Sequence, residues 1–243
     1  KSGLNSDMLK TNYLDHLIEI KGDSSVYDQE PVKPPEVEQT DIEKASDLID
    51  QGDLDGAELL LKSLVDKMPD AWQPRTKERG ILSIAFWDSK EYRDSLACEK
   101  EALGSPNTID RIEPSYSGAY YWLSNIEIAR NNPGQALEYL ARAESLESDH
   151  PLIFFNRGYI YNRMGRYSEG YEEFKKSLVV RRCIPAKQKA EAYRGMGVAL
   201  IGLKKFHEAK EILNKSLALD PGDKTAFNEL EYIKHLINMY GSE

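Results

Sequence analysis

The residue types that most often carry catalysis are scattered along this chain. Gly195, Gly197 and Gly202 faintly resemble a nucleotide-binding loop. However, Leu200 occupies a position where that fingerprint needs glycine, and no strand is expected before it. The histidines show no zinc-type pairing and no neighbouring nucleophile pattern; they are His16, His150, His207 and His235. The sequence therefore predicts no enzyme, no cofactor and no metal site.

The two cysteines and the hydropathy leave the compartment open. Cys98 and Cys183 are far apart in the sequence, so we expect two thiols in the core or at the surface and no bridge. No apolar run approaches the ~18 residues that a membrane span needs. We expect a soluble chain, in the cytoplasm or, if a targeting segment has been removed, in the periplasm or outside the cell.

The charge is unevenly distributed. The chain carries a net charge of -9, but the stretch from Lys175 to Lys205 has nine basic residues and one acidic residue, or +8. The remainder therefore carries -9 minus 8, or -17. This basic belt is either a pair of solvated helix faces or a docking patch for an acidic segment. The overall acidity disfavours nucleic acid as a partner.

The clearest local pattern is the stretch Ala190–Asp223, which reads as two helices joined by a turn. Lys204 and Lys205 lie in the break, and Pro221 ends the second helix. Apolar and small residues recur at a spacing of three and four, which gives one buried stripe for each helix. These residues are Tyr193, Met196, Gly197, Leu200, Phe206, Ala209, Leu213 and Leu217.

This hairpin resembles the tetratricopeptide repeat, a pattern of thirty-four residues. The same frame recurs in four further copies, at 38–71, 76–109, 117–150 and 151–184. The copy at 76–109 is the weakest, because Arg79 and Glu99 occupy positions meant for large apolar residues. The resemblance implies an all-α fold, in which about five hairpins form a right-handed superhelical array over residues 40–223.

Three further segments flank the array. Thr40 and Glu43 form a capping box that predicts the start of the first repeat helix. Trp72 lies in the connector after the first copy and is expected to cover the junction. The three flanking segments are an amphipathic helix at 1–22, an acidic proline-rich linker at 23–39 and a capping helix at 224–243.

The resemblance also implies which residues line the concave face of the array. Aromatic rings there would take side chains of an extended peptide, amides its backbone and arginines its carboxylates. The expected partner-binding residues are Tyr121, Trp122, Asn125, Phe155, Asn156, Tyr159, Asn162, Arg163 and Arg194, with Ile128 and Val198 beside them. The alternative is that the aromatics pack against the neighbouring repeat and the arginines form internal salt bridges.

Some members of this family bind chaperone tails through a carboxylate clamp. Asn125 and Asn156 match its two amide positions. Tyr121, Glu191 and Gly195 stand where the clamp needs lysine or arginine, so most of it is absent.

The leading hypothesis is a non-catalytic scaffold or adaptor that binds a peptide segment or a protein surface in the concave groove. The alternative is an inhibitor or immunity-type protein that blocks a basic enzyme with its acidic surface, which predicts binding that weakens steeply with salt. A further hypothesis is that the acidic segment 28–38 occupies the chain's own groove until a partner displaces it.

Overall fold

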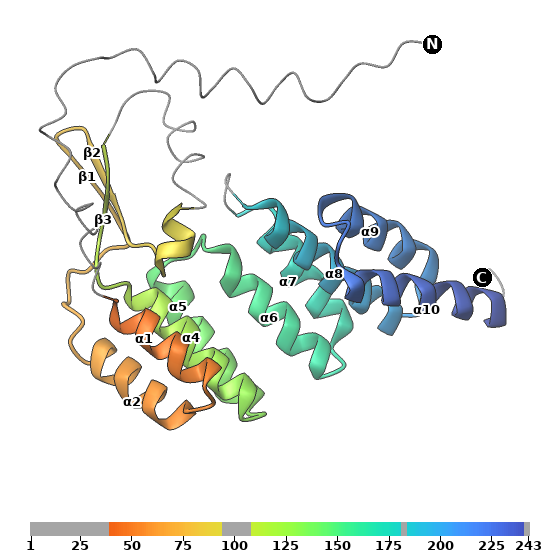
Figure 1. Ribbon diagram of the computed structural model, residues 1–243, viewed down its shortest axis with the longest axis horizontal. Helices are drawn as coiled ribbons and strands as arrows, with labels where there is room; N and C mark the ends of the chain where they lie inside the picture. Colours follow the sequence, from red (N-terminus) through yellow and green to blue (C-terminus); the bar gives the residue numbers. More distant parts are fainter. Residues whose placement is uncertain (1–38, 94–107, 181–183, 241–243) are drawn as a thin grey trace, which may run out of the picture. The chain divides into compact units, whose positions relative to one another are not determined.

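The computed structural model describes residues 39–93, 108–180 and 184–240, which belong to one compact unit, 39–243. The predicted helix at 1–22, nearly all of the linker and the self-binding segment 28–38 lie outside the described residues. So do Cys98 and Cys183. The described part is a helical repeat array, as the sequence predicts, with one small sheet (Figure 1).

The first hairpin consists of α1 (Asp41–Asp50) and α2 (Leu54–Val65). The capping box is present: the Thr40 side chain accepts from the Glu43 backbone N–H at 3.2 Å, and the Thr40 N–H donates to the Glu43 carboxylate at 3.0 Å. Two backbone N–H groups at the exposed helix end are thereby satisfied. Gly52 closes the turn at φ +85°, a left-handed conformation that glycine adopts without a steric cost.

The prediction of a helical hairpin over 76–109 is wrong. The described residues of this range form strands β1 (Arg75–Glu78) and β2 (Ile81–Ile84), and β3 (Thr108–Arg111) begins near its end. The sheet order is β1-β2-β3, antiparallel in the first pair and parallel in the second. Residues 89–93 are helical.

The local chemistry explains this sheet. Arg79 and Gly80 both have positive φ, at 48° and 85°. A two-residue hairpin turn whose twist matches that of the strands requires positive φ at both residues. Leu82 and Ile84 alternate with more exposed neighbours, which is the period of a strand. The repeat frame counted these apolar residues correctly as buried but assigned them to a helix.

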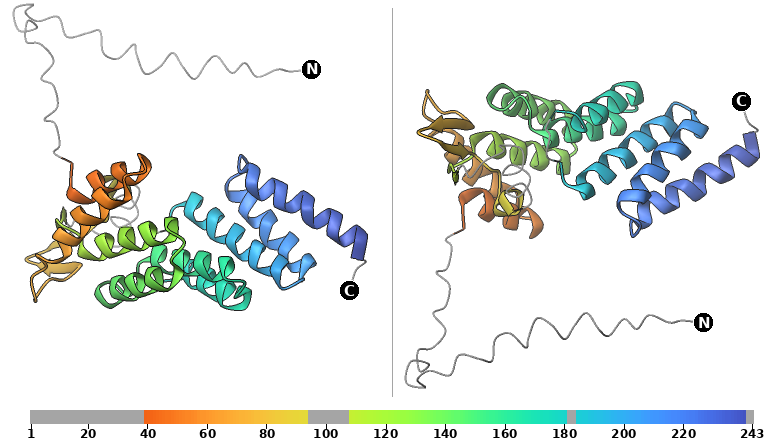
Figure 2. Two further views of the ribbon diagram at one scale, coloured as in Figure 1. Left: turned by 90° about the horizontal axis from the view of Figure 1, so that it is seen from below. Right: turned by 90° about the horizontal axis from the view of Figure 1, so that it is seen from above.

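The other predicted hairpins and the capping helix occupy the rest of the chain. The third copy contains α4 (Tyr116–Ala129) and α5 (Pro133–Leu146), and the fourth contains α6 (Pro151–Arg163) and α7 (Tyr167–Ser177). The fifth contains α8 (Ala186–Gly202) and α9 (Phe206–Leu219), followed by α10 (Lys224–Tyr240). Figure 2 shows the hairpins following one another in chain order, with α10 after the last.

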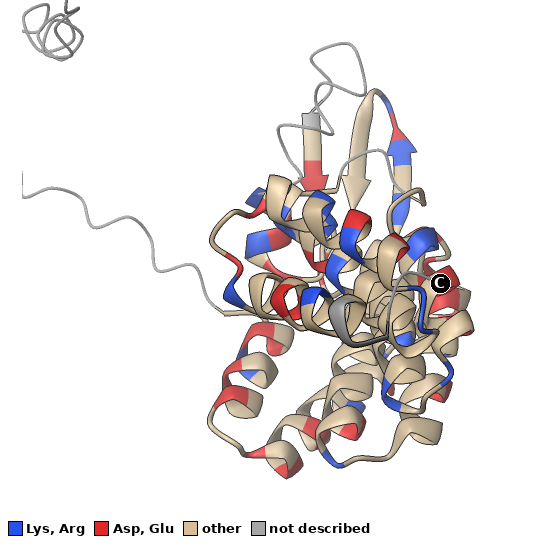
Figure 3. Ribbon diagram, turned by 90° about the vertical axis from the view of Figure 1, so that its right-hand side faces the viewer, with Lys and Arg blue, Asp and Glu red and all other residues tan. Residues whose placement is uncertain are grey.

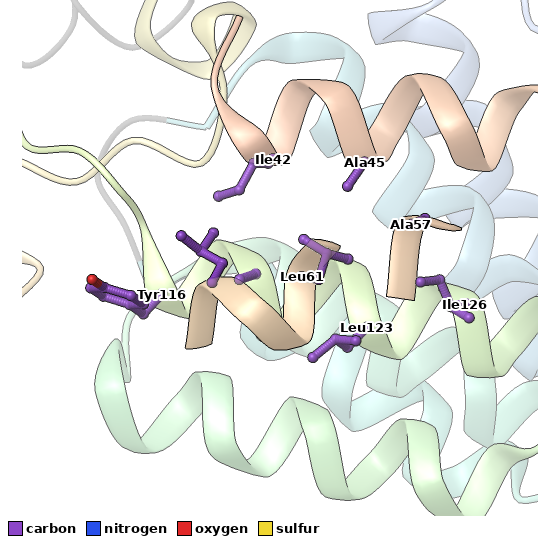
Figure 4. Close-up of a cluster of buried hydrophobic side chains, with 9 residues drawn as sticks. Ile42, Ala45, Ala57, Leu61, Tyr116, Leu123 and Ile126 are labelled. Atoms are coloured by element: carbon purple, nitrogen blue, oxygen red, sulfur yellow. The ribbon is translucent and has the colours of Figure 1, made fainter. Parts of the chain in front are cut away.

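The first hairpin packs directly on the third copy. Ile42 and Ala45 from α1 and Ala57 and Leu61 from α2 form one buried cluster with Leu123 and its neighbours from α4 (Figure 4). Trp72 packs edge-on against Tyr116 with ring centroids 5.3 Å apart, so the connector covers this junction. Copies one and three are therefore neighbours although the sheet lies between them in the sequence.

Trp87 fastens the segment after β2 to the third and fourth copies. Its indole N–H lies 3.0 Å from the Ser117 hydroxyl and 2.9 Å from the Glu147 carboxylate, and its ring stacks on His150 at 3.4 Å between centroids. Gly118 makes room, because a Cβ there would lie 2.9 Å from the indole. The polar atoms in this buried site pair with one another, as burial requires.

We expect Trp87→Ala to lower the free energy of unfolding by about 3–5 kcal/mol, because it opens a cavity and removes a donor to the buried Glu147 carboxylate. Urea denaturation followed by circular dichroism measures this loss. The control is Phe227→Ala on α10, whose ring is 53% exposed and whose removal should change stability by less than about 0.5 kcal/mol. Equal stability of the two variants would contradict the role of Trp87.

Candidate interaction surface

Three helices carry the predicted partner-binding residues, and local signals fix where each begins. The Ser115 side chain accepts from the Gly118 N–H at 3.2 Å and starts α4. Pro151 is the first residue of α6, a position where the missing N–H costs nothing. Pro185 precedes α8. Each helix is the first of its hairpin.

The amides of Asn125 and Asn156 bind each other across α4 and α6. The Asn156 side-chain N–H donates to the Asn125 carbonyl at 2.8 Å. The Tyr121 hydroxyl joins them; burial raises the pKa of its phenol, and its hydrogen bonds to the two asparagines oppose that rise. These polar groups link adjacent repeats by hydrogen bonds. Some of their donors and acceptors are therefore already paired within the protein.

Two further predicted residues pack between repeats. The Asn162 amide donates to the backbone carbonyl of Gly195 at 3.0 Å and so links α6 to α8. Phe155 packs edge-on against Phe174 of the same hairpin at 5.3 Å between ring centroids, and both rings join an apolar cluster with residues of α8. The ring of Phe174 also lies against Gly195, where an added Cβ would overlap it. Both side chains hold the array together.

Arg194 forms an internal ion pair. Its guanidinium lies 3.1 Å from the Asp223 carboxylate, which stands just before α10. This is the structural alternative that the sequence left open for the arginines. The half-buried Val198 lies one turn further along α8.

Trp122 faces α1 and the segment after β2. It lines a hollow of about 250 Å³ together with Ile42, Glu43, Asp88 and other polar residues of these segments. Its indole nitrogen is buried and has no hydrogen-bond partner within the described part of the chain. The sequence could not place this contact because it expected a helix where the sheet lies.

Tyr159 and Arg163 are the predicted residues that remain open to solvent. Tyr159 is 43% exposed, and the Arg163 guanidinium lies over its ring at 5.8 Å from the centroid. Arg163 also donates to the Asn131 side chain at 3.1 Å and, with Ile128 and the 45% exposed Met164, lines a hollow of about 110 Å³. Sequence reasoning missed Met164; the signal was an apolar residue directly before the turn at Gly165.

Acidic residues just outside the basic belt pair with lysines at its two ends. Lys176 pairs with Glu173 at 2.6 Å and Lys205 with Glu208 at 3.3 Å, and each acid lies three residues from its lysine. Figure 3 shows the same mixing of both signs along the helices. Arg181 and Arg182 lie outside the described residues. An acidic segment at this belt stays a prediction.

Two searches of the described residues bear on other function classes. No group of three or more histidine, cysteine or acidic side chains in ranges 39–93, 108–180 and 184–240 is arranged to hold a metal ion. Among the helices that the structure describes, none is both long and apolar enough to cross a membrane.

The comparisons with known proteins agree on the fold. The tetratricopeptide repeat family model matches residues 147–221. A solved structure of pilF from Pseudomonas aeruginosa is similar over 82% of this chain and 68% of its own, with 16% identity and a TM-score of 0.56. A search of curated proteins found no match.

Shorter matches include two solved domains. The first tetratricopeptide repeat domain of human RPAP3 is 20% identical over 51% of this chain and 93% of its own, with a TM-score of 0.47. The Sgt2 domain from Aspergillus fumigatus is 21% identical over 51% and 81%, also at 0.47. The likeness to pilF shows the fold alone.

The raised pKa of Tyr121 predicts a pH dependence of stability. An unfolded tyrosine ionises near pH ~10, whereas the folded state favours the neutral phenol, so this stabilisation is present below pH ~10 and is lost as pH rises through the folded pKa. Tyr121→Phe cannot ionise. It should be less stable than the parent by about 0.5–1.5 kcal/mol at pH 8 through its lost hydrogen bonds, and this difference should shrink by pH 11.

Urea midpoints at the two pH values test this expectation. Tyr232→Phe is the control, because it removes the hydroxyl group of a ring that is 52% exposed. A constant deficit of Tyr121→Phe would mean that the phenol is not protected from ionisation.

Proposed function

We propose that this tetratricopeptide repeat protein is a non-catalytic scaffold or adaptor that binds a peptide segment or a protein surface on α4, α6 and α8. The observation that carries the proposal is the exposed pair of Tyr159 and Arg163 on the middle helix. Exposed aromatic and arginine side chains are the types that dominate binding energy at protein interfaces. The pair offers a partner both the apolar face of the ring and a guanidinium group that can bind a carboxylate.

The hydrogen bond between Asn125 and Asn156 supports the same face. Because hydrogen bonds fix α4 against α6 and α6 against α8, the exposed side chains stand on a rigid surface before any partner arrives. A preformed surface loses less conformational entropy on binding. A rigid surface therefore binds an extended segment more favourably than a surface made of a loop that must become ordered on binding.

The inhibitor or immunity-type alternative has less to support it. On the side drawn in Figure 3, Lys and Arg alternate with Asp and Glu along the helices. Residues 1–38, which are part of the acidic N-terminal half that motivated this alternative, lie outside the described ranges. The described residues therefore favour the scaffold.

A site-specific photo-crosslinker tests the proposed face. The crosslinker replaces Tyr159 in one version of the chain and Phe227, another exposed ring, on α10, in a second version. In lysate of the source organism, the version labelled at 159 should capture a defined protein that the version labelled at 227 does not. Capture of the same proteins by both would contradict binding on this face.

The captured protein then allows a quantitative test. Tyr159→Ala should weaken its binding by roughly tenfold or more, as expected for an interface anchor. Lys187→Ala, which removes an exposed charge at the start of α8, should change affinity by less than about fivefold. Isothermal titration with the purified partner measures both, and the reverse ranking would reject the aromatic anchor.

A further inference from the structure

From the third copy onward, each hairpin forms the same kind of junction with the next hairpin or, after the last, with α10, which gives three junctions in the described chain. In each, the turn inside one hairpin faces the end of the first helix of the next. Copies three and five begin at 117 and 190, a shift of 190 minus 117, or 73 residues. The same shift carries α6, which starts at 151, onto α10, which starts at 224. Equivalent positions can therefore be compared directly.

The first two junctions are largely filled. Between copies three and four, Pro133, Arg163 and Met164 leave a hollow of only about 110 Å³. Between copies four and five, the Tyr167 ring covers Gly202, where an added Cβ would lie 2.5 Å from it. A side chain of one repeat thus occupies the space that the next repeat leaves.

The third junction is open. A hollow of about 630 Å³ lies between the α8–α9 turn and the second half of α10. Phe206 stands at the position equivalent to Pro133 and Tyr167, and Leu236 at the position equivalent to Arg163 and Gly202. The volume lies in the range of sites that bind small ligands or anchor side chains.

About half of the lining of this hollow is apolar. Ile201 and Phe206 line it from the turn side, and Tyr232, Leu236 and Ile237 line it from α10. Tyr232 is 52% exposed, so water reaches a large ring that a partner would cover. Covering this ring and the aliphatic wall provides a hydrophobic driving force.

The rim of the hollow is positively charged. Lys204, Lys205 and His207 stand on it with one acid, Glu208, which pairs with Lys205 at 3.3 Å. Lys204 has no ion-pair partner among the described residues. On α10, Lys234 and Glu231 pair with each other and cancel. The unpaired positive charge at the rim favours a negatively charged partner.

The backbone at Lys204 supplies a second observation. Lys204 has φ 62°, and the equivalent turn residues of the other three hairpins are Gly52, Asn131 and Gly165, all with positive φ. Glycine and asparagine tolerate this conformation, whereas lysine is strained in it. A strained residue at a position where glycine serves elsewhere in the same chain points to a role for its side chain.

We propose that this hollow is a second docking site, which binds an extended acidic peptide through one bulky apolar side chain. The apolar side chain enters between Phe206 and Tyr232, and a flanking carboxylate of the peptide pairs with Lys204. The site is separate from the face that carries Tyr159, so it stands or falls independently of the function proposed above.

The test uses a labelled synthetic peptide in which leucine and phenylalanine are flanked by three glutamates on each side. Fluorescence anisotropy with the full chain should show saturable binding. A peptide with lysines in place of the glutamates should bind more weakly, because it meets the positive rim. Failure of the acidic peptide to bind at millimolar concentration, or equal binding of both peptides, would overturn the proposal.

Four variants locate the site. Lys204→Gly should weaken binding roughly two- to fivefold while its Tm stays equal or rises, because the strain is relieved. Tyr232→Ala should weaken it roughly tenfold. The matched controls Lys215→Ala and Phe227→Ala remove an exposed charge and an exposed ring outside the hollow and should leave affinity unchanged. Equal losses in variants and controls would show that the peptide binds elsewhere.

Tyr159→Ala separates the two proposals. It should not change the affinity of the acidic peptide. If Tyr159→Ala abolishes binding and Tyr232→Ala does not, the peptide occupies the face on α4, α6 and α8, and the second site is excluded.

Discussion

The burial of Trp87 is the constraint on which the N-terminal half of the array depends. Its indole lies against α4 at Gly118, bonds to Glu147 after α5 and stacks on His150 before α6. A single side chain thus holds three elements in place. The buried Glu147 and His150 each have one hydrogen bond to this segment, from the Trp87 indole and with the Glu91 carboxylate, and these two bonds form only when the segment after β2 is docked. The geometry of α4 and α6, and with it the exposed face, follows from this docking.

The helices were predictable where apolar periodicity persists for several turns. Ala190–Asp223 shows this best, because Ala209 and Leu213 are fully buried at the positions that the frame assigns to the core. The prediction of a helical hairpin over 76–109 was wrong because the repeat frame counts only apolar positions. Such a count cannot distinguish Leu82 and Ile84 of a strand from the apolar stripe of a helix. The decisive signal was the turn at Arg79 and Gly80, which is local and has no place in a thirty-four-residue pattern.

The candidate site was predictable in its location more than in its exposure. Family position placed Asn125, Asn156 and Tyr159 on first helices, where the structure has them. Whether a side chain on such a helix is free depends on distances between helices. Asn125 and Asn156 are close enough to bond to each other, whereas Tyr159 is not covered by a neighbour. Sequence spacing within one helix carries no information on these separations.

The sheet also affects how the array can lose its structure. Because α1 and α2 pack directly on α4, the hydrophobic stacking of hairpins passes from the first copy to the third without using the strands. The sheet is joined to this stack through Trp87 and its neighbours, and its own apolar cluster is built from Leu82, Ile84, Phe86 and Ile109. When such an insertion opens, the apolar cluster of α1, α2 and α4 remains, whereas the contacts that Trp87 makes with α4, Glu147 and His150 are lost. The protein therefore combines a continuous stack of hairpins with an insert that has a small core of its own and is held to the stack at Trp87.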